Sequence, residues 1–147
     1  MNLEDDIFAG CTSLVKLVLP NSIKKIPAYM CEGCRRLEEI TIPETVEIIG
    51  KNAFDGCKAI KSIKIPKGVK KINEYAFWDC TGLKDVYMSF ETKTYGWVFS
   101  TRNHNGNGRS LDCVFHFYEN EINNQMKSNS GDIIEKLKEE SNKVKEI

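Results

Sequence analysis

The sequence predicts an α/β repeat solenoid, with a parallel β-sheet on its concave face, an irregular convex side and a helix at the C-terminus. The first observation is a strict period, because cysteines recur every 23 residues, at Cys11, Cys34, Cys57 and Cys80. The second is that each cysteine precedes a short run of alternating apolar and variable residues, a pattern typical of strands. A unit of this length cannot cover its own apolar face, whereas stacked units bury a continuous column of equivalent residues.

Each repeat has the same frame around its cysteine. Residues 53–66 of the third repeat read Ala-Phe-Asp-Gly-Cys-Lys-Ala-Ile-Lys-Ser-Ile-Lys-Ile-Pro, and residues 7–20, 30–43 and 76–89 follow the same plan. The last four residues of each frame are the expected strand, and in three repeats it ends in a proline that cannot donate to a ladder. We expect five inward columns: Leu14, Leu37, Ile60 and Leu83; Leu17, Ile40, Ile63 and Val86; Leu19, Ile42, Ile65 and Met88; Ile23, Val46 and Val69; and Ile26, Ile49 and Ile72.

The motif Ala-Phe-x-Gly-Cys-x-x-Leu-x-x-Ile-x-Ile-Pro resembles the BspA-like leucine-rich repeat family over residues 7–99. The resemblance implies a leucine-rich-repeat stack. Members of that family are typically surface or secreted proteins of bacteria and protists that adhere to host proteins or to other cells, so adhesion is an expectation from the resemblance. The chain departs from the motif where Cys31 replaces phenylalanine, Asp79 replaces glycine and Ser89 replaces proline. The lead-in strand before Ile7 is missing, so the first coil is expected to be incomplete.

The chain divides into a predicted solenoid and a tail. Residues 1–118 are expected to hold about four 23-residue repeats plus an atypical C-terminal cap unit, as is common in repeat proteins. Within them, residues 100–109 are rich in glycine and asparagine and read as an exposed loop before a cap strand at 111–118. Residues 119–147 are expected to be a polar tail with an amphipathic helix at about 131–147. Its apolar stripe consists of Ile133, Ile134, Leu137, Val144 and Ile147.

Charge and composition exclude two classes of partner. The chain has 21 basic and 21 acidic residues, so it lacks the positive excess that attracts nucleic acid. No run of eighteen apolar residues is present, so membrane insertion is not expected. The acidic N-terminal segment does not resemble a secretory signal, and the chain as written is expected to be cytoplasmic. If the chain is a fragment, the family resemblance favours a secreted or cell-surface protein.

Catalysis is not expected from the residue chemistry. The cysteine column, together with Cys31 in the phenylalanine column, is interpreted as buried structural thiols without disulfides. That interpretation is preferred to a redox or zinc role for the Cys31-x-x-Cys34 pair. The two histidines, His104 and His116, have no triad or ligand set at a matching spacing. We therefore expect no enzyme activity, no cofactor and no metal.

The outward strand positions are the predicted partner-binding surface, because packing of the solenoid does not use them. These positions are Lys16, Val18, Glu39, Thr41, Ser62, Lys64, Asp85 and Tyr87, with Trp97 added as an anchor. Their mixed charge with aromatic residues suits a protein ligand. The leading hypothesis is a protein–protein interaction module that binds a protein ligand through the concave face. The alternative is a structural or self-associating repeat domain without an independent ligand, forming a homo-oligomer through the exposed N-terminal coil or the C-terminal helix.

Overall fold

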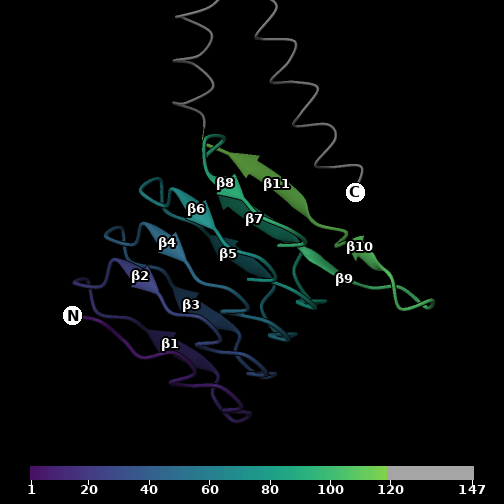
Figure 1. Cartoon of the computed structure of the whole chain (residues 1–147), viewed down its shortest axis with the longest axis horizontal. Helices are drawn as coiled ribbons and strands as arrows, with labels where there is room; N and C mark the ends of the chain where they lie inside the picture. Colours follow the sequence, from purple (N-terminus) through teal and green to yellow (C-terminus); the bar gives the residue numbers. More distant parts are fainter. Residues whose placement is uncertain (119–147) are drawn as a thin grey trace, which may run out of the picture.

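The computed structural model describes residues 1–118, which form a β-solenoid of stacked coils (Figure 1). Each coil contributes a strand to the front face, which we define by β1 (Lys16–Val18), β3 (Glu39–Thr41), β5 (Ser62–Lys64), β7 (Asp85–Met88) and β11 (Val114–Phe117). No helix occurs within residues 1–118, so this part of the chain is all-β and not α/β. The helix expected at 131–147 lies outside the described residues.

The register of the front strands confirms the 23-residue period. Leu17 pairs with Ile40 between β1 and β3, and Ile63 pairs with Val86 between β5 and β7. Strand β11 lies inside the segment 111–118 that was expected to form a cap strand, and it adds to β7 in parallel. Here Val86 pairs with Phe115, so this connection is six residues longer than the repeat. The front ladder therefore joins coils of two different lengths.

The extra length forms a hairpin where the sequence predicted only a loop. Strands β9 (Ser100–Arg102) and β10 (Gly108–Ser110) pair in an antiparallel manner. Asn103 organises the turn between them, because its Oδ1 accepts hydrogen bonds from the backbone N–H groups of Asn105 and Asn107, each at 2.9 Å. Asparagine commonly closes turns in this way. The polar composition that indicated a loop was therefore compatible with a short two-stranded ribbon.

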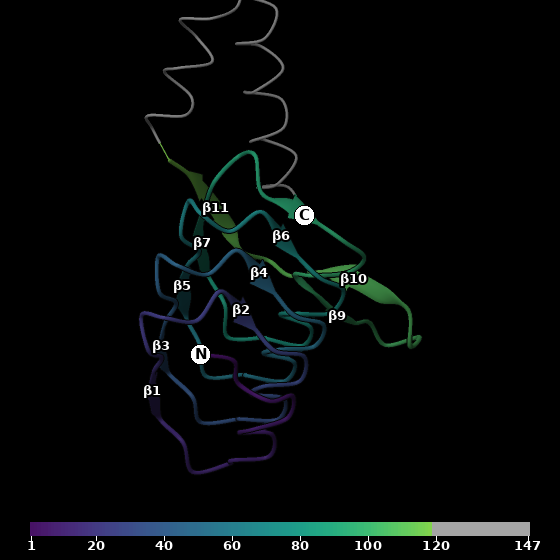
Figure 2. The same ribbon diagram turned by 60° about the vertical axis from the view of Figure 1, so that its left-hand side comes forward.

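A second parallel sheet corrects the expectation of an irregular convex side. It contains β2 (Lys25–Ile26), β4 (Ile48–Ile49), β6 (Lys71–Ile72) and β8 (Lys93–Thr94), paired in that order without a break. Figure 2 shows these strands along a side of the coils separate from the front face.

A third line of backbone hydrogen bonds joins the turns of successive coils, for example from Cys31 N–H to Ala53 O at 2.7 Å and from Phe54 N–H to Ala76 O at 2.7 Å.

The predicted inward columns form the core. Leu37, Ile60 and Leu83 are buried, while Leu14 in the first coil is half-buried. Beside them, the Phe54 and Phe77 rings stack at 5.1 Å, and the Phe77 and Phe99 rings stack at 5.2 Å. Burial of each such side chain contributes about 2 kcal/mol relative to exposure. The column of Phe54 and Phe77 thus continues one coil beyond the recognisable repeats.

The cysteine column links each coil to the preceding one through thiol hydrogen bonds. The thiol of Cys34 donates to the carbonyl of Phe8 at 3.1 Å, that of Cys57 to Cys31 at 3.2 Å and that of Cys80 to Phe54 at 3.0 Å. Burial raises the pKa of the Cys57 and Cys80 thiols well above its ordinary value, so both remain protonated donors. All six cysteines are unpaired in the structure. Their spacing therefore has a structural explanation within the coil.

Two left-handed backbone positions turn each coil at its corner. One is occupied by Gly10, Gly33 and Gly56, with φ between 72° and 76°, and in the fourth repeat by Asp79 with φ 59°. A side chain in this conformation costs about 1 kcal/mol. The Asp79 carboxylate offsets part of that cost, because it accepts a hydrogen bond from Thr101 Oγ1 at 2.7 Å. This explains how the motif tolerates aspartate at a glycine position.

Candidate partner-binding surfaces

The front face carries eight of the nine predicted partner-binding residues. The strand register places Lys16 beside Glu39, and Lys64 beside Tyr87. Lys16 Nζ lies 3.5 Å from Glu39 Oε2, and both side chains are largely exposed. An exposed pair of this kind contributes little to folding. The Lys16 and Glu39 side chains are exposed and can therefore contact a partner. Their role in binding is still a prediction.

A break divides the front face between β3 and β5. β3 pairs only with β1, and β5 pairs only with β7, among the strands of residues 1–118. Elsewhere the next coil donates to the previous one, as from Glu38 N–H to Val15 O at 2.8 Å and from Lys84 N–H to Lys61 O at 2.8 Å. In the described residues, no equivalent backbone hydrogen bond joins β5 to β3. Within residues 1–118, each of these two strands therefore presents an unpaired edge toward the other.

The break is hollowed into a groove of about 530 Å³, which we call the front groove. Its β3 wall includes Glu39 and Thr41, and its β5 wall includes Ser62 and Lys64. Sequence reasoning placed these four residues on one face, but it did not predict that they would line a groove. Tyr118 also lines the groove, and its Oη donates a hydrogen bond to Ile65 O.

The two walls of the front groove carry side chains of opposite charge. Acidic side chains, Glu38, Glu39 and Glu44, lie on the β3 side, and basic side chains, Lys64 and Lys67, lie on the β5 side. Lys67 Nζ also lies 5.3 Å from the centre of the Tyr118 ring. Opposed signs across a groove favour one orientation of a charged ligand over the reverse.

A second cluster on the front face was missed from the sequence. His116 Nε2 lies 2.8 Å from Asp85 Oδ1, and the His116 ring stacks on Tyr87 with centroids 4.5 Å apart. The neighbours of His116 were not predictable from the sequence, because they depend on the length of the insertion before β11. The structure places it opposite Tyr87 in the ladder and makes it part of the candidate surface.

Trp97 does not lie with the other predicted residues. It follows β8 at a corner of the solenoid, where it is half exposed and has a φ of 52°. There it lines a pocket of about 460 Å³, which we call the corner pocket. The other side chains of the corner pocket belong to Asn52, Asp55, Tyr75, Trp78 and Arg102. The 23-residue spacing of Asn52 and Tyr75, and of Asp55 and Trp78, was the signal that could have identified this cluster.

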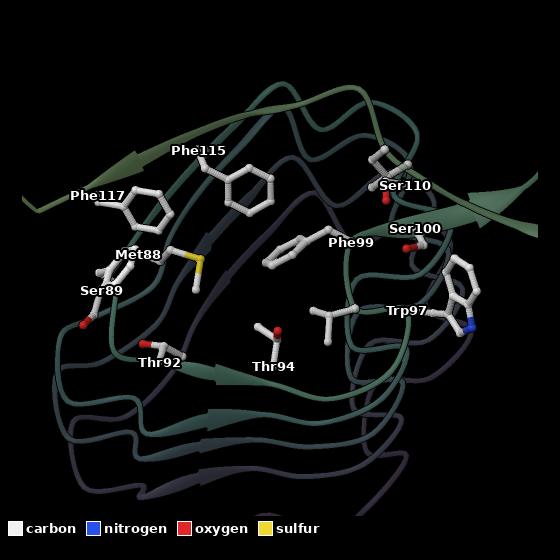
Figure 3. Close-up of a pocket in the computed structure, with 13 residues that line it drawn as sticks. Met88, Ser89, Thr92, Thr94, Trp97, Phe99, Ser100, Ser110, Phe115 and Phe117 are labelled. Carbon is white, nitrogen blue, oxygen red and sulfur yellow. The ribbon is translucent and has the colours of Figure 1, made fainter. Parts of the chain in front are cut away.

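A third hollow of about 410 Å³ lies at the C-terminal end of the coils (Figure 3). The side chains of Met88 in β7, Phe115 in β11 and Phe99, just before β9, point into it. Trp97 also lines this hollow, with its ring directed outward. This end pocket is mainly apolar and continues the core beyond the last complete repeat. The β11 strand runs along one side of this hollow and carries Phe115 and Phe117 (Figure 3).

Within residues 1–118, no group of three or more histidine, cysteine, aspartate or glutamate side chains is placed to hold a metal ion. No helix in this part of the chain has the length and apolar character needed to cross a bilayer.

Comparison with known proteins identifies the family. Residues 1–104 match the BspA type leucine rich repeat region in six copies. The crystal structure of the T. pallidum leucine rich repeat protein TpLRR is 31% identical, with a TM-score of 0.61, over 64% of this chain and 44% of that one. A leucine rich cell surface protein from Faecalibacterium prausnitzii A2-165 shares the fold at 24% identity, with a TM-score of 0.57, over 71% of this chain and 28% of that one. This chain thus spans less than half the length of either protein, and no curated protein sequence matches it. The chain belongs to the BspA type leucine rich repeat family.

Proposed function

We propose that the chain is a protein-interaction module that binds an extended segment of a partner protein in the front groove. The observation that carries this proposal is the interruption of the front ladder, which leaves facing edges of β3 and β5 without a strand partner among residues 1–118. A strand edge with unpaired N–H and C=O groups is a template for another strand. An extended peptide added to such an edge gains affinity from backbone hydrogen bonds and specificity from alternate side chains.

The side chains around the front groove supply the specificity in this proposal. Glu39 on one wall and Lys64 on the other favour a segment with basic residues toward β3 and acidic residues toward β5. Tyr87 and His116 extend the contact surface beyond the groove and offer a flat aromatic pair. Aromatic residues of this kind commonly anchor protein interfaces.

We propose that this protein interaction serves adhesion. One of the similar structures carries the description of a cell surface protein. The sequence resemblance to BspA-like proteins carries the expectation of adhesion. The chain covers less than half of either similar structure. Its ligand and its location are therefore proposals, which the similar structures do not establish. We infer that the partner is a protein displayed outside the cell.

The first experiment is affinity capture from a lysate and from extracellular matrix proteins, with the purified chain as bait. A partner identified in this way is then titrated against the Lys64→Ala/Tyr87→Ala double variant, which should weaken binding at least tenfold. The matched control is Lys25→Ala, because Lys25 is an exposed lysine on the second sheet. Equal affinity of all three proteins would place the binding site elsewhere.

End-to-end self-association is the second candidate function, favoured by the exposed edge of β1. Val18 is 69% exposed and Val15 is 47% exposed, and β1 pairs on only one side within the described residues. Two chains could extend the front ladder by pairing these edges. Light scattering over a hundredfold range of concentration tests this candidate. A mass that rises with concentration and returns to the monomer in Val18→Lys supports it, and a constant monomer mass excludes it.

A further inference from the structure

The corner pocket is a second surface feature, separate from the front groove. Its side chains come from successive coils, with Asn52, Tyr75 and Trp97 all at left-handed corner positions with φ of 55°, 59° and 52°. Asp55 and Trp78 occupy an adjacent column, three residues after Asn52 and Tyr75. Stacking of the coils thus brings aromatic and polar side chains together in one pocket.

The aromatic side chains of the corner pocket are held in defined positions. The Tyr75 and Trp78 rings meet edge to face, with centroids 5.3 Å apart and an angle of 88° between their planes. The Trp97 ring packs against Gly108, where an added Cβ would lie 3.0 Å from the ring. Even so, Trp97 remains 51% exposed. An exposed aromatic surface that is already fixed by its neighbours loses little conformational entropy when a ligand stacks on it.

The polar side chains supply directional hydrogen-bonding groups. Asn52 Nδ2 donates to Asp55 Oδ2 at 2.8 Å, and burial raises the pKa of the Asp55 carboxyl group. Asn52 Oδ1 is buried and accepts no hydrogen bond within the described residues. Arg102 adds an exposed guanidinium group.

The charge of the corner pocket decides between classes of ligand. One carboxylate and one guanidinium line it, so its formal charge is balanced. Arg102 opposes the binding of an ammonium group by the aromatic rings, and Asp55 opposes the binding of a phosphate or sulfate. The balanced pocket therefore favours an uncharged ligand with both apolar and polar surfaces.

A sugar ring has this combination, because it presents apolar C–H groups on its faces and hydroxyl groups at its edge. Tyr75, Trp78 and Trp97 can contact the C–H faces, while amide, carboxylate and guanidinium groups can exchange hydrogen bonds with the hydroxyls. The volume of about 460 Å³ is within the range of small-molecule sites. We infer that the corner pocket binds an uncharged oligosaccharide, independently of the protein ligand proposed for the front groove.

The intrinsic fluorescence of the chain reports directly on this pocket. The chain has two tryptophans, Trp78 and Trp97, and both line the corner pocket. Chitotriose, cellotriose and maltotriose are the neutral probes, with sialyllactose as an anionic probe and choline as a cationic probe. We expect at least one neutral trisaccharide to change the tryptophan emission in a saturable manner. A response to none of the neutral probes, or to choline or sialyllactose alone, would overturn the inference.

Variants separate binding from folding. Trp97→Ala and Arg102→Ala should each weaken trisaccharide binding at least tenfold. Because Arg102 is exposed, its replacement should leave the stability of the fold nearly unchanged. Tyr95→Ala is the matched control, because Tyr95 is an exposed aromatic residue two positions from Trp97 but outside the corner pocket. Calorimetry measures binding to the variant that lacks Trp97. Unchanged affinity in both pocket variants would contradict the inference, whereas the Lys64→Ala/Tyr87→Ala variant should bind the sugar normally.

Discussion

The thiol of Cys80 donates a hydrogen bond to the carbonyl oxygen of Phe54, 3.0 Å away in the preceding coil. The same oxygen accepts the backbone N–H of Cys57 at 3.1 Å, so both lone pairs of a buried carbonyl are used. The cysteine that marks the repeat is therefore a small apolar side chain that also links two coils.

Replacing Cys80 tests this link. Cys80→Ala should lower the free energy of unfolding by about 2 kcal/mol, because it removes both buried volume and a donor to the Phe54 carbonyl. Cys80→Ser retains a donor and should cost less. Urea denaturation measures both, with Cys11→Ala as a control because Cys11 is exposed. Equal losses in the alanine and serine variants would show that the hydrogen bond adds no stability.

Buried thiols also predict a loss of stability at alkaline pH. Burial raises the pKa of Cys113 to about 11 from an ordinary value of 9.0, and it raises the pKa of Cys57 and Cys80 as well. In the unfolded chain these thiols ionise above pH 9, while the folded protein keeps them protonated. Unfolding then releases protons, so stability is retained below pH 9 and falls as the pH rises toward 11.

Thermal unfolding at pH 8, 9 and 10 measures this effect. The Tm should fall over this range, and it should fall less steeply in a Cys113→Ala variant, which has one fewer raised pKa. Parallel curves for the two proteins would exclude a contribution from Cys113.

Two glycines should differ sharply in their tolerance of a side chain. A Cβ on Gly50 would lie 2.7 Å from both Ile26 O and Ala28 N of the adjacent coil, and Gly50→Ala should cost about 3 kcal/mol. A Cβ on Gly10 meets no atom within 4 Å, so Gly10→Ala should cost only about 1 kcal/mol, from its left-handed backbone. Denaturant midpoints rank the variants. A larger loss for Gly10→Ala would contradict the packing of these coils.

The division of the chain at residue 118 can be tested by truncation. A chain of residues 1–118 should unfold in one cooperative transition, because its core columns are contained within those residues. Subtracting its far-ultraviolet circular dichroism spectrum from that of the full chain should leave a helical spectrum, as the stripe at 131–147 predicts. A difference spectrum without helical character would contradict the predicted helix.

The coil and its register were predictable because every column repeats its chemistry every 23 residues. The phenylalanine, cysteine and leucine positions of the motif were each predicted to be buried. Phe54, Cys57 and Ile60 confirm this, because all three are buried. The second sheet was not anticipated, because strands of two residues such as β4 are too short for an alternating pattern.

The candidate surfaces were less predictable than the core. The eight front residues follow from alternation along the strands, but the break between β3 and β5 has no local signal, since both repeats follow the same motif. His116 was missed because its pairing with Tyr87 depends on a connection six residues longer than the repeat. Trp97 was placed with the front residues, although its left-handed backbone puts it at a corner.

Hydrogen exchange of the complex is the decisive measurement of whether an extended partner segment binds in the front groove. With a captured partner bound, backbone amides of β3 (Glu39–Thr41) or β5 (Ser62–Lys64) should exchange at least tenfold more slowly. Those of β2 (Lys25–Ile26), on the second sheet, should not change. Protection confined to the second sheet or the corner pocket, with unchanged exchange in β3 and β5, would contradict the account.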